Sequence, residues 1–210
     1  MHIEPGYISA AKIALANVAA AGILGSQTFQ LLKKPQLVFR TLLAAVFFTL
    51  FMQAFHLPVG PSELHFVGAM PIYLTFGFVP TLLGFGLGLL LQGLMFTPTD
   101  LVHLGVNTLS LAVPLMLVHA TFGNRLQAVS VKTILKLDAF YYSGVTLMVG
   151  FWLAVGEVAT PLSAWLTFAS SYLALVMMEP VFTWMIIIGL KRLETSKLAR
   201  YCFEYRVGTA

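Results

Sequence analysis

The chain has 210 residues, of which 59% are apolar and only 10% charged, and its mean hydropathy is +0.88. That composition excludes a soluble globular domain, because long apolar stretches of this kind form helices that span a bilayer. The formal net charge of +4 is small and unevenly spread, so it gives no reason to expect nucleic-acid binding, and a single cysteine, Cys202, excludes disulfides.

The chain begins with the sequence MHIEPG, which has neither the basic region nor the cleavage motif of a signal peptide. The amine of Met1, the amide nitrogen of His2 and its imidazole Nδ1 can close a five-membered and a six-membered ring around one cation. Planar nitrogen ligands suit Ni²⁺ or Cu²⁺, with Co²⁺ close behind. Pro5-Gly6 could fold this peptide back over the helices, although an ordinary turn before a helix is the simpler reading of that pair alone.

Apolar runs predict seven membrane-spanning helices, with six as the alternative. The candidate spans cover residues 7–26, 37–57, 64–78, 81–96, 101–122, 140–156 and 162–190. Residues 64–96 taken as one helix would extend about 50 Å, which is too long for a bilayer, so we expect a tight turn near Val79-Pro80. The predicted fold is therefore an all-α polytopic bundle, with one permease domain over residues 1–190 and a basic tail over residues 191–210.

The basic residues indicate how the bundle is oriented. With seven spans, eleven of the twelve Lys and Arg residues fall at one face, which the positive-inside rule makes cytoplasmic, and only Lys12 lies elsewhere. Four acidic residues go to the other face: Glu4, Glu63, Asp100 and Glu157. We expect a multi-pass protein of a bacterial or archaeal cell membrane, with the N-terminus outside and the tail inside.

Four of the five histidines follow the acids to the outer face. His56 ends the second span, His65 opens the third and His103 opens the fifth, while His2 lies at the chain start; His119 approaches the cytoplasmic end. Imidazoles and carboxylates gathered at one face would attract cations. Histidines at helix ends also occur simply as interface residues, and that reading stays open for each of them taken alone.

The segment 56–65 joins the second and third spans. Its two prolines and one glycine predict a short, stiff loop that delivers His65 at the start of a helix directed into the bundle. Together with the chelating groups of Met1 and His2, His65 could complete four nitrogens around one ion. The candidate residues around such a site, for ion entry or for contact with a ligand, are Glu4, His56, Glu63, His103 and Asn107.

Two polar side chains are predicted inside spans. Asn107 should be hydrogen-bonded to another helix or to backbone, either as structural support or as the partner of a ligating histidine. Glu179 precedes Pro180 deep in the last span, where a carboxylate is a functional candidate by default. A protonated Glu179 bonded to a neighbouring helix is an equal alternative. Three glycines within residues 84–88 predict close approach of another helix.

Four motifs follow one another along the chain: MHI with Pro5-Gly6, PVGPS at 58–62 followed by His65, QGLMF at 92–96, and GVNT at 105–108. Their order and spacing resemble the cobalt/nickel substrate-binding permease family, the CbiM- and NikM-type S-components of energy-coupling-factor ABC transporters. The resemblance covers about residues 1–190. This sequence departs from the family at Glu4-Pro5, where the familiar order is exchanged, and at His56.

The resemblance implies a seven-helix bundle into which the first residues insert from outside. It implies a square-planar metal held by the amine of Met1, the amide and imidazole nitrogens of His2, and the imidazole of His65. It also implies partners: a CbiQ-like transmembrane coupling protein, CbiO-like cytoplasmic ATPases and, in some systems, a small accessory membrane protein. Metal supply for cobalamin biosynthesis is a role that this family would serve.

These patterns predict a transporter subunit rather than an enzyme. It would capture Co²⁺ or Ni²⁺ for an ATP-driven importer, with ATP hydrolysed by separate chains because the sequence has no phosphate-binding loop. A solitary permease without an ATPase is one alternative. A b-type haem protein is another, although His103 and His119, about 24 Å apart on one span, lack a matching pair on a second helix. An intramembrane hydrolase would depend on Ser143-Gly144, which no histidine base follows.

Overall fold

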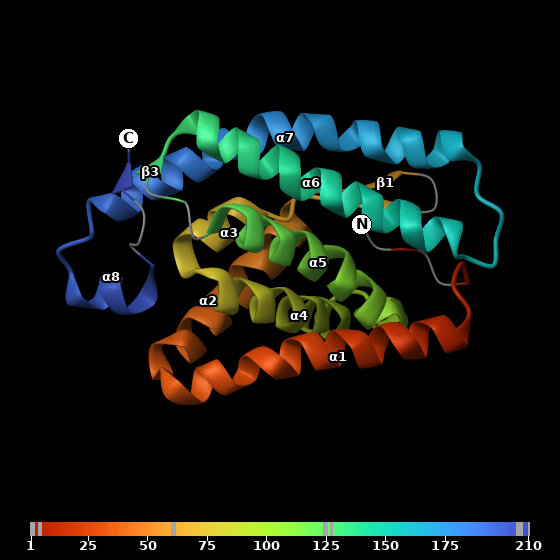
Figure 1. The fold of residues 1–210 in the computed structure, drawn as a ribbon, viewed down its shortest axis with the longest axis horizontal. Coiled ribbons are helices and arrows are strands. Elements are labelled where there is room, and N and C mark those ends of the chain that lie inside the picture. The colour runs from red at the N-terminus through yellow and green to blue at the C-terminus, as the bar shows by residue number, and fades with distance from the viewer. Residues whose placement is uncertain are drawn as a thin grey trace.

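The structure is a computed structural model and describes residues 3, 6–59, 62–123, 126, 128–204 and 208–209. Within these residues six helices have 18 to 30 residues each: α1 (Ala10–Lys33), α2 (Pro35–Ala54), α4 (Phe78–Met95), α5 (Leu104–Phe122), α6 (Val131–Ala154) and α7 (Leu162–Lys191). In Figure 1 these helices run along the long axis of the molecule, with α1 on one side and the adjacent α6 and α7 on the other.

Shorter elements connect the long helices. They are the antiparallel hairpin β1 (His56–Val59) and β2 (Ser62–His65), the short helix α3 (Ala69–Phe76), the 3-10 helix η1 (Pro98–His103), the helix α8 (Lys197–Cys202), and β3 (Ala128–Val129), which pairs in parallel with β4 (Gly208–Thr209).

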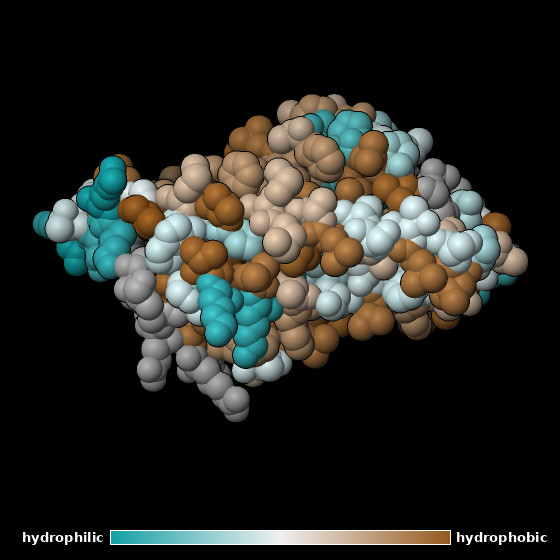
Figure 2. All heavy atoms as spheres, turned by 90° about the horizontal axis from the view of Figure 1, so that it is seen from above, coloured by the Kyte–Doolittle hydropathy of each residue, from teal (hydrophilic) through white to brown (hydrophobic). Residues whose placement is uncertain are grey.

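Five regions of the described chain are long and apolar enough to cross a membrane: Pro35–Ala54, Phe78–Met95, Pro98–Phe122, Val131–Ala154 and Leu162–Lys191. Hydrophobic side chains also cover much of the face in Figure 2, and hydrophilic ones gather at the end that carries α8. The prediction of an all-α polytopic membrane protein is therefore confirmed.

The third predicted span differs from the structure. Residues 64–78 were expected to form one helix that His65 opens, but residues 62–65 form β2 and the helix begins only at Ala69. The physical reason is the pairing of two short segments, in which His56 faces His65 and Val59 faces Ser62. Backbone groups that a helix would satisfy internally are satisfied here across the hairpin.

The break between α3 and α4 also comes earlier than expected. Gly77, not Val79-Pro80, separates the helices, with a φ of +88° that favours glycine. Pro80 instead lies in the first turn of α4. N–H groups there have no partner within the helix, so the missing N–H of proline costs no hydrogen bond. A side chain at Gly77 would also meet the Glu204 carboxylate, 2.5 Å from an ideal Cβ position.

The glycine-rich face of α4 packs on α2, as its sequence predicts. A Cβ built on Gly84 would lie 2.7 Å from the Ala44 Cβ, and one built on Gly88 would lie 2.5 Å from the Phe48 ring. Neither approach leaves room for a methyl group. The glycines therefore set how closely the two helix backbones come together.

Arg40 of α2 holds the segment around α8 against the bundle. Arg40 is 9% exposed. Its guanidinium donates to the main-chain oxygens of Arg200, Tyr201 and Phe203 at 2.9, 3.1 and 2.5 Å, and it pairs with Glu204 at 3.2 Å. A buried charge is tolerated when its donors are satisfied in this way. The residues after α7 therefore return to α2.

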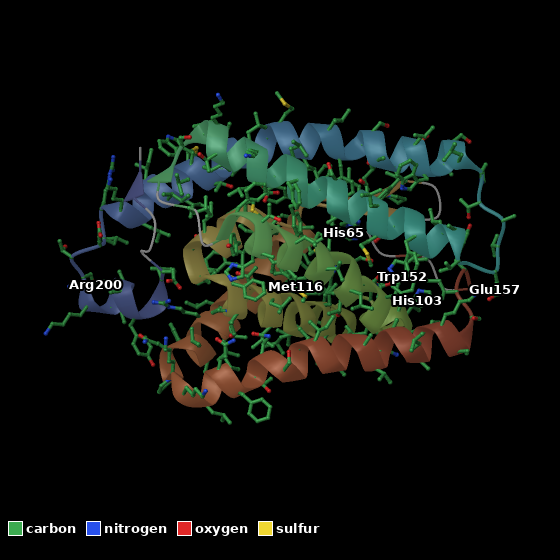
Figure 3. All side chains as sticks on the ribbon, in the orientation of Figure 1. His65, His103, Met116, Trp152, Glu157 and Arg200 are labelled. Atoms are coloured by element: carbon green, nitrogen blue, oxygen red, sulfur yellow. The ribbon has the colours of Figure 1, made fainter. Side chains whose placement is uncertain are left out.

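The opposite end is tied together by Lys12 of α1. Its ammonium donates to Val155 O and to the Glu157 carboxylate, both at 2.7 Å, and the Glu157 amide donates to Tyr7 O at 2.8 Å. The hydrogen bond from Lys12 lowers the pKa of the Glu157 carboxyl. Figure 3 shows Glu157 and Arg200 at opposite ends of the molecule, with His103 towards the Glu157 end.

Candidate metal site

The hairpin presents His65 at the end of β2, where the residue is 2% exposed. Its Nε2 lies 2.9 Å from a Glu63 carboxylate oxygen, and its Nδ1 lies 3.4 Å from Met52 O. The His56 ring from the paired position on β1 stacks over it, with 6.1 Å between centroids. The imidazole is therefore held from three sides before any ion arrives.

Ile3 joins the hairpin as a third, single-residue strand. It forms an antiparallel bridge with Ser62 and is 1% exposed. Its main-chain oxygen accepts a hydrogen bond of 2.8 Å from His103 Nδ1. Ile3 is thus fixed to two elements that are distant in sequence, the hairpin and the end of η1.

The bond to Ile3 decides the tautomer of His103. A carbonyl oxygen can only accept, so Nδ1 carries the hydrogen and Nε2 of the neutral ring is an acceptor. His103 is 1% exposed, and its Nε2 has no hydrogen-bond partner among the described residues. This atom is one of a few buried acceptors at this end of the bundle, with Gln92 Oε1 and Asn107 Oδ1, that have no partner within the described ranges.

A cavity of about 420 Å³ opens between these elements. Its lining is polar, with two histidines and two carboxylates, and is formed by Ile3, Gln53, His56, Glu63, His65, Gln92, Phe96, Thr97, Thr99 and Asp100. The sequence predicted that His56, Glu63 and His65 would lie together, and the structure brings them together with Asp100.

Two buried amide side chains, Asn107 and Gln92, lie near this end of the bundle. Asn107 is 1% exposed, but its Oδ1 has no hydrogen-bond partner in the described part of the chain, contrary to the expected bond. Gln92, which lines the cavity and was not a predicted site residue, has an equally unpartnered Oε1 and is 3% exposed. A glutamine within an apolar span is the signal that would have identified it.

Three predicted site residues, Met1, His2 and Glu4, lie outside the described residues. Within the residues that are described, no three His, Cys, Asp or Glu side chains gather closely enough to hold a metal ion. Glu179 lies away from the cavity and accepts from the Met70 amide at 3.0 Å and from the Tyr142 hydroxyl.

The fold and this cavity define a polytopic membrane protein with a polar site at one end of its bundle. The family described as cobalt uptake substrate-specific transmembrane region, CbiM, matches residues 2–196. The chain belongs to this family of transmembrane proteins.

Two individual proteins are also similar. A Haemophilus influenzae protein named "Putative metal transport protein" is 32% identical over 130 residues, 60% of each chain, so the match spans three fifths of that relative's length. The crystal structure of a transition metal transporter superposes with a TM-score of 0.73 and 21% identity, over 96% of this chain and 97% of that one. This second likeness concerns the fold.

Proposed function

We propose that this chain is the subunit that captures Co²⁺ or Ni²⁺ for an ATP-driven importer. The ion is bound by the amine of Met1, the amide and imidazole nitrogens of His2, and the imidazole of His65. Nitrogen donors in one plane match the preferences of these two ions. Family membership favours this reading over the haem-binding one.

The observation that carries the proposal is the direction of the Ile3–Ser62 bridge. The pairing is antiparallel, so a chain that continued the same direction before Ile3 would approach the residues after Ser62, and so His65. His65 is three positions along β2, or about 10 Å at the rise of a strand. Two residues before Ile3 can extend about 7 Å, which leaves the chelating groups within bonding reach of that imidazole.

The surroundings of the cavity suit a captured cation. Glu63 and Asp100 give the lining negative charge, and this raises the local concentration of divalent ions. An ion on His65 Nε2 would replace the proton now shared with Glu63, so the Glu63 carboxylate must rotate or join the coordination sphere when the ion binds. His103 acts by positioning, since it holds Ile3 O and so fixes the peptide that carries the chelator.

Energy for release comes in this proposal from separate chains. A transmembrane coupling protein and cytoplasmic ATPases bind the helix ends near α8, with a small accessory membrane protein as a further partner. In this proposal the cavity faces the outside and the α8 end lies in the cytoplasm.

Calorimetric titration of the purified protein with Ni²⁺ and Co²⁺ tests the site. We expect His2→Ala, His65→Ala and a chain extended by a few residues before Met1 to lose most of their affinity, because each removes a nitrogen ligand. The same residues inserted between the exposed Glu194 and Thr195 serve as the matched control and should leave affinity unchanged. Wild-type affinity in both the His2→Ala and the extended protein would reject the proposed ligands.

A further inference from the structure

Behind the hairpin, α6 and α7 enclose two carboxyl groups that the metal site does not use. Asp138 of α6 and Glu179 of α7 are both 0% exposed, and their side chains lie within hydrogen-bonding reach of each other. The predicted sixth span, 140–156, left Asp138 outside the membrane. The helix instead starts at Val131 and carries Asp138 into the interior.

The two carboxyl groups differ in their donors. Glu179 accepts from the Tyr142 hydroxyl and from the Met70 amide, and the Ala69 amide is also directed at it. Neither oxygen of Asp138 has a donor in the part of the chain that the structure describes. Two carboxylates are both acceptors, so only a proton on one of them can join the pair.

Two phenols complete the cluster. The hydroxyls of Tyr141 and Tyr172 are buried without a hydrogen-bond partner among the described residues. The Tyr141 phenol is within electrostatic range of Asp138, Glu179 and Tyr172. Two buried hydroxyl groups therefore lie beside the carboxyl pair without a hydrogen bond in the described residues.

In the described part of the chain, no positive charge compensates the pair. Neither carboxyl group forms an ion pair with Lys, Arg or His in the described ranges. Two other titratable groups on the packed elements have partners elsewhere: Tyr73 of α3 bonds to His119 of α5, and Lys136 of α6 lies over the Phe122 ring at 4.9 Å. Two ionised carboxylates side by side in such an interior would be strongly unfavourable.

We propose that Asp138 and Glu179 form a proton-binding site inside the membrane. One proton is bound to Asp138, and the protonated Asp138 carboxyl donates a hydrogen bond to the Glu179 carboxylate. The proton is on Asp138 because Glu179 has the donors that stabilise a carboxylate and Asp138 has none. A proton fits better than a metal ion, since both side chains are fully enclosed and a shared proton needs no room between them.

The site is connected to the segment that carries His65. Glu179 accepts a hydrogen bond from the Met70 amide at the start of α3, five residues after His65, and the Tyr172 hydroxyl lies near the His65 main chain. We therefore expect Ni²⁺ binding to alter the hydrogen bond between the two carboxyl groups. This coupling rests on the proposed function, whereas the proton site does not.

Infrared spectroscopy of the purified chain tests the proton directly, through the C=O stretch of a protonated carboxyl group at about pH 7, where exposed Asp and Glu are ionised. The wild type should show such a band, Asp138→Asn should lose it, and Glu179→Gln should keep it at a shifted frequency. Glu157→Gln, which removes an exposed carboxyl, is the control and should leave the band unchanged. Addition of Ni²⁺ should shift the wild-type band.

A wild-type spectrum without the band overturns the proton site, and so does a band that survives Asp138→Asn. If Asp138→Asn does not fold, a Glu179→Gln band identical to that of the wild type has the same consequence. An unshifted band in protein with bound Ni²⁺ overturns the coupling alone. Absence of Ni²⁺ binding with the band present counts against the proposed function and not against the proton site.

Discussion

His103 shows how a single hydrogen bond can fix a segment that lies 100 residues away in the chain. Its ring is buried at the end of η1, and its one bond in the described chain fixes Ile3 O. A bond of this kind contributes about 0.5–1.5 kcal/mol, which corresponds to roughly a tenfold change in an equilibrium constant at the upper end. The loss of this bond should therefore appear as a measurable loss of metal affinity.

We expect His103→Leu to weaken Ni²⁺ binding about tenfold, since the peptide that precedes Ile3 then has to be ordered without this anchor. His103→Asn should recover part of the loss, because its side-chain nitrogen can take the place of Nδ1 as donor to Ile3 O. Titration calorimetry of the three proteins measures the difference. Equal affinity in His103→Leu and the wild type would show that the Ile3 anchor is irrelevant to binding.

At the scale of elements, helix contacts are decided by side-chain size where helices meet. Gly84 lies where α4 touches α2, with ideal Cβ positions 2.7 Å from Ala44 Cβ and 3.2 Å from main-chain atoms of Ala44 and Ala45. Gly22 of α1 has nothing within 4 Å of the same position. Because both are helical glycines, the pair separates packing from helix propensity.

Gly84→Ala should lower stability by about 1–3 kcal/mol, because the added methyl forces the α2 and α4 backbones apart. Gly22→Ala should be neutral or slightly stabilising, since alanine is the better helix former and meets no neighbour. Thermal unfolding in detergent compares the two variants with the wild type. Similar midpoints for Gly84→Ala and Gly22→Ala would mean that the α2–α4 contact tolerates a wider spacing.

At the scale of the whole molecule, the two ends differ in chemistry. One end has the hairpin, His103 and Glu157, and the other has α8, Arg200 and the start of α6 (Figure 3). From the positive-inside rule we expect the second end to lie in the cytoplasm.

Cysteine labelling tests that orientation. A cysteine at the exposed position of Ala159 should react with a membrane-impermeant maleimide in intact cells. A cysteine at exposed Thr195 should react only after the membrane is permeabilised, and the native Cys202 is buried, which keeps the background low. The reverse labelling pattern would place the cavity on the cytoplasmic side and reject uptake from outside.

Much of this architecture was accessible from the sequence. Apolar runs predict the long helices, and the spacing of glycines within 84–88 predicts the close contact of α4 with another helix. The sequence also groups His56, Glu63 and His65 into one segment, so that their meeting in the cavity needs no tertiary information. The predicted start of the sixth span was wrong. Lys132, Lys136 and Asp138 lower the hydropathy before residue 140, but all three belong to α6, which begins at Val131.

What composition and periodicity determined about this protein is a membrane bundle with nitrogen and carboxylate groups at one end, since burial in lipid dictates both helix length and where charge can lie. Only the tertiary structure decided the rest. Residues 62–65 form a strand because they pair with residues 56–59. Ile3 contacts Ser62 and His103, which lie 59 and 100 positions further along the chain. The pairing of Asp138 with Glu179 likewise depends on how α6 packs on α7, and no local pattern encodes which polar groups that packing leaves without water.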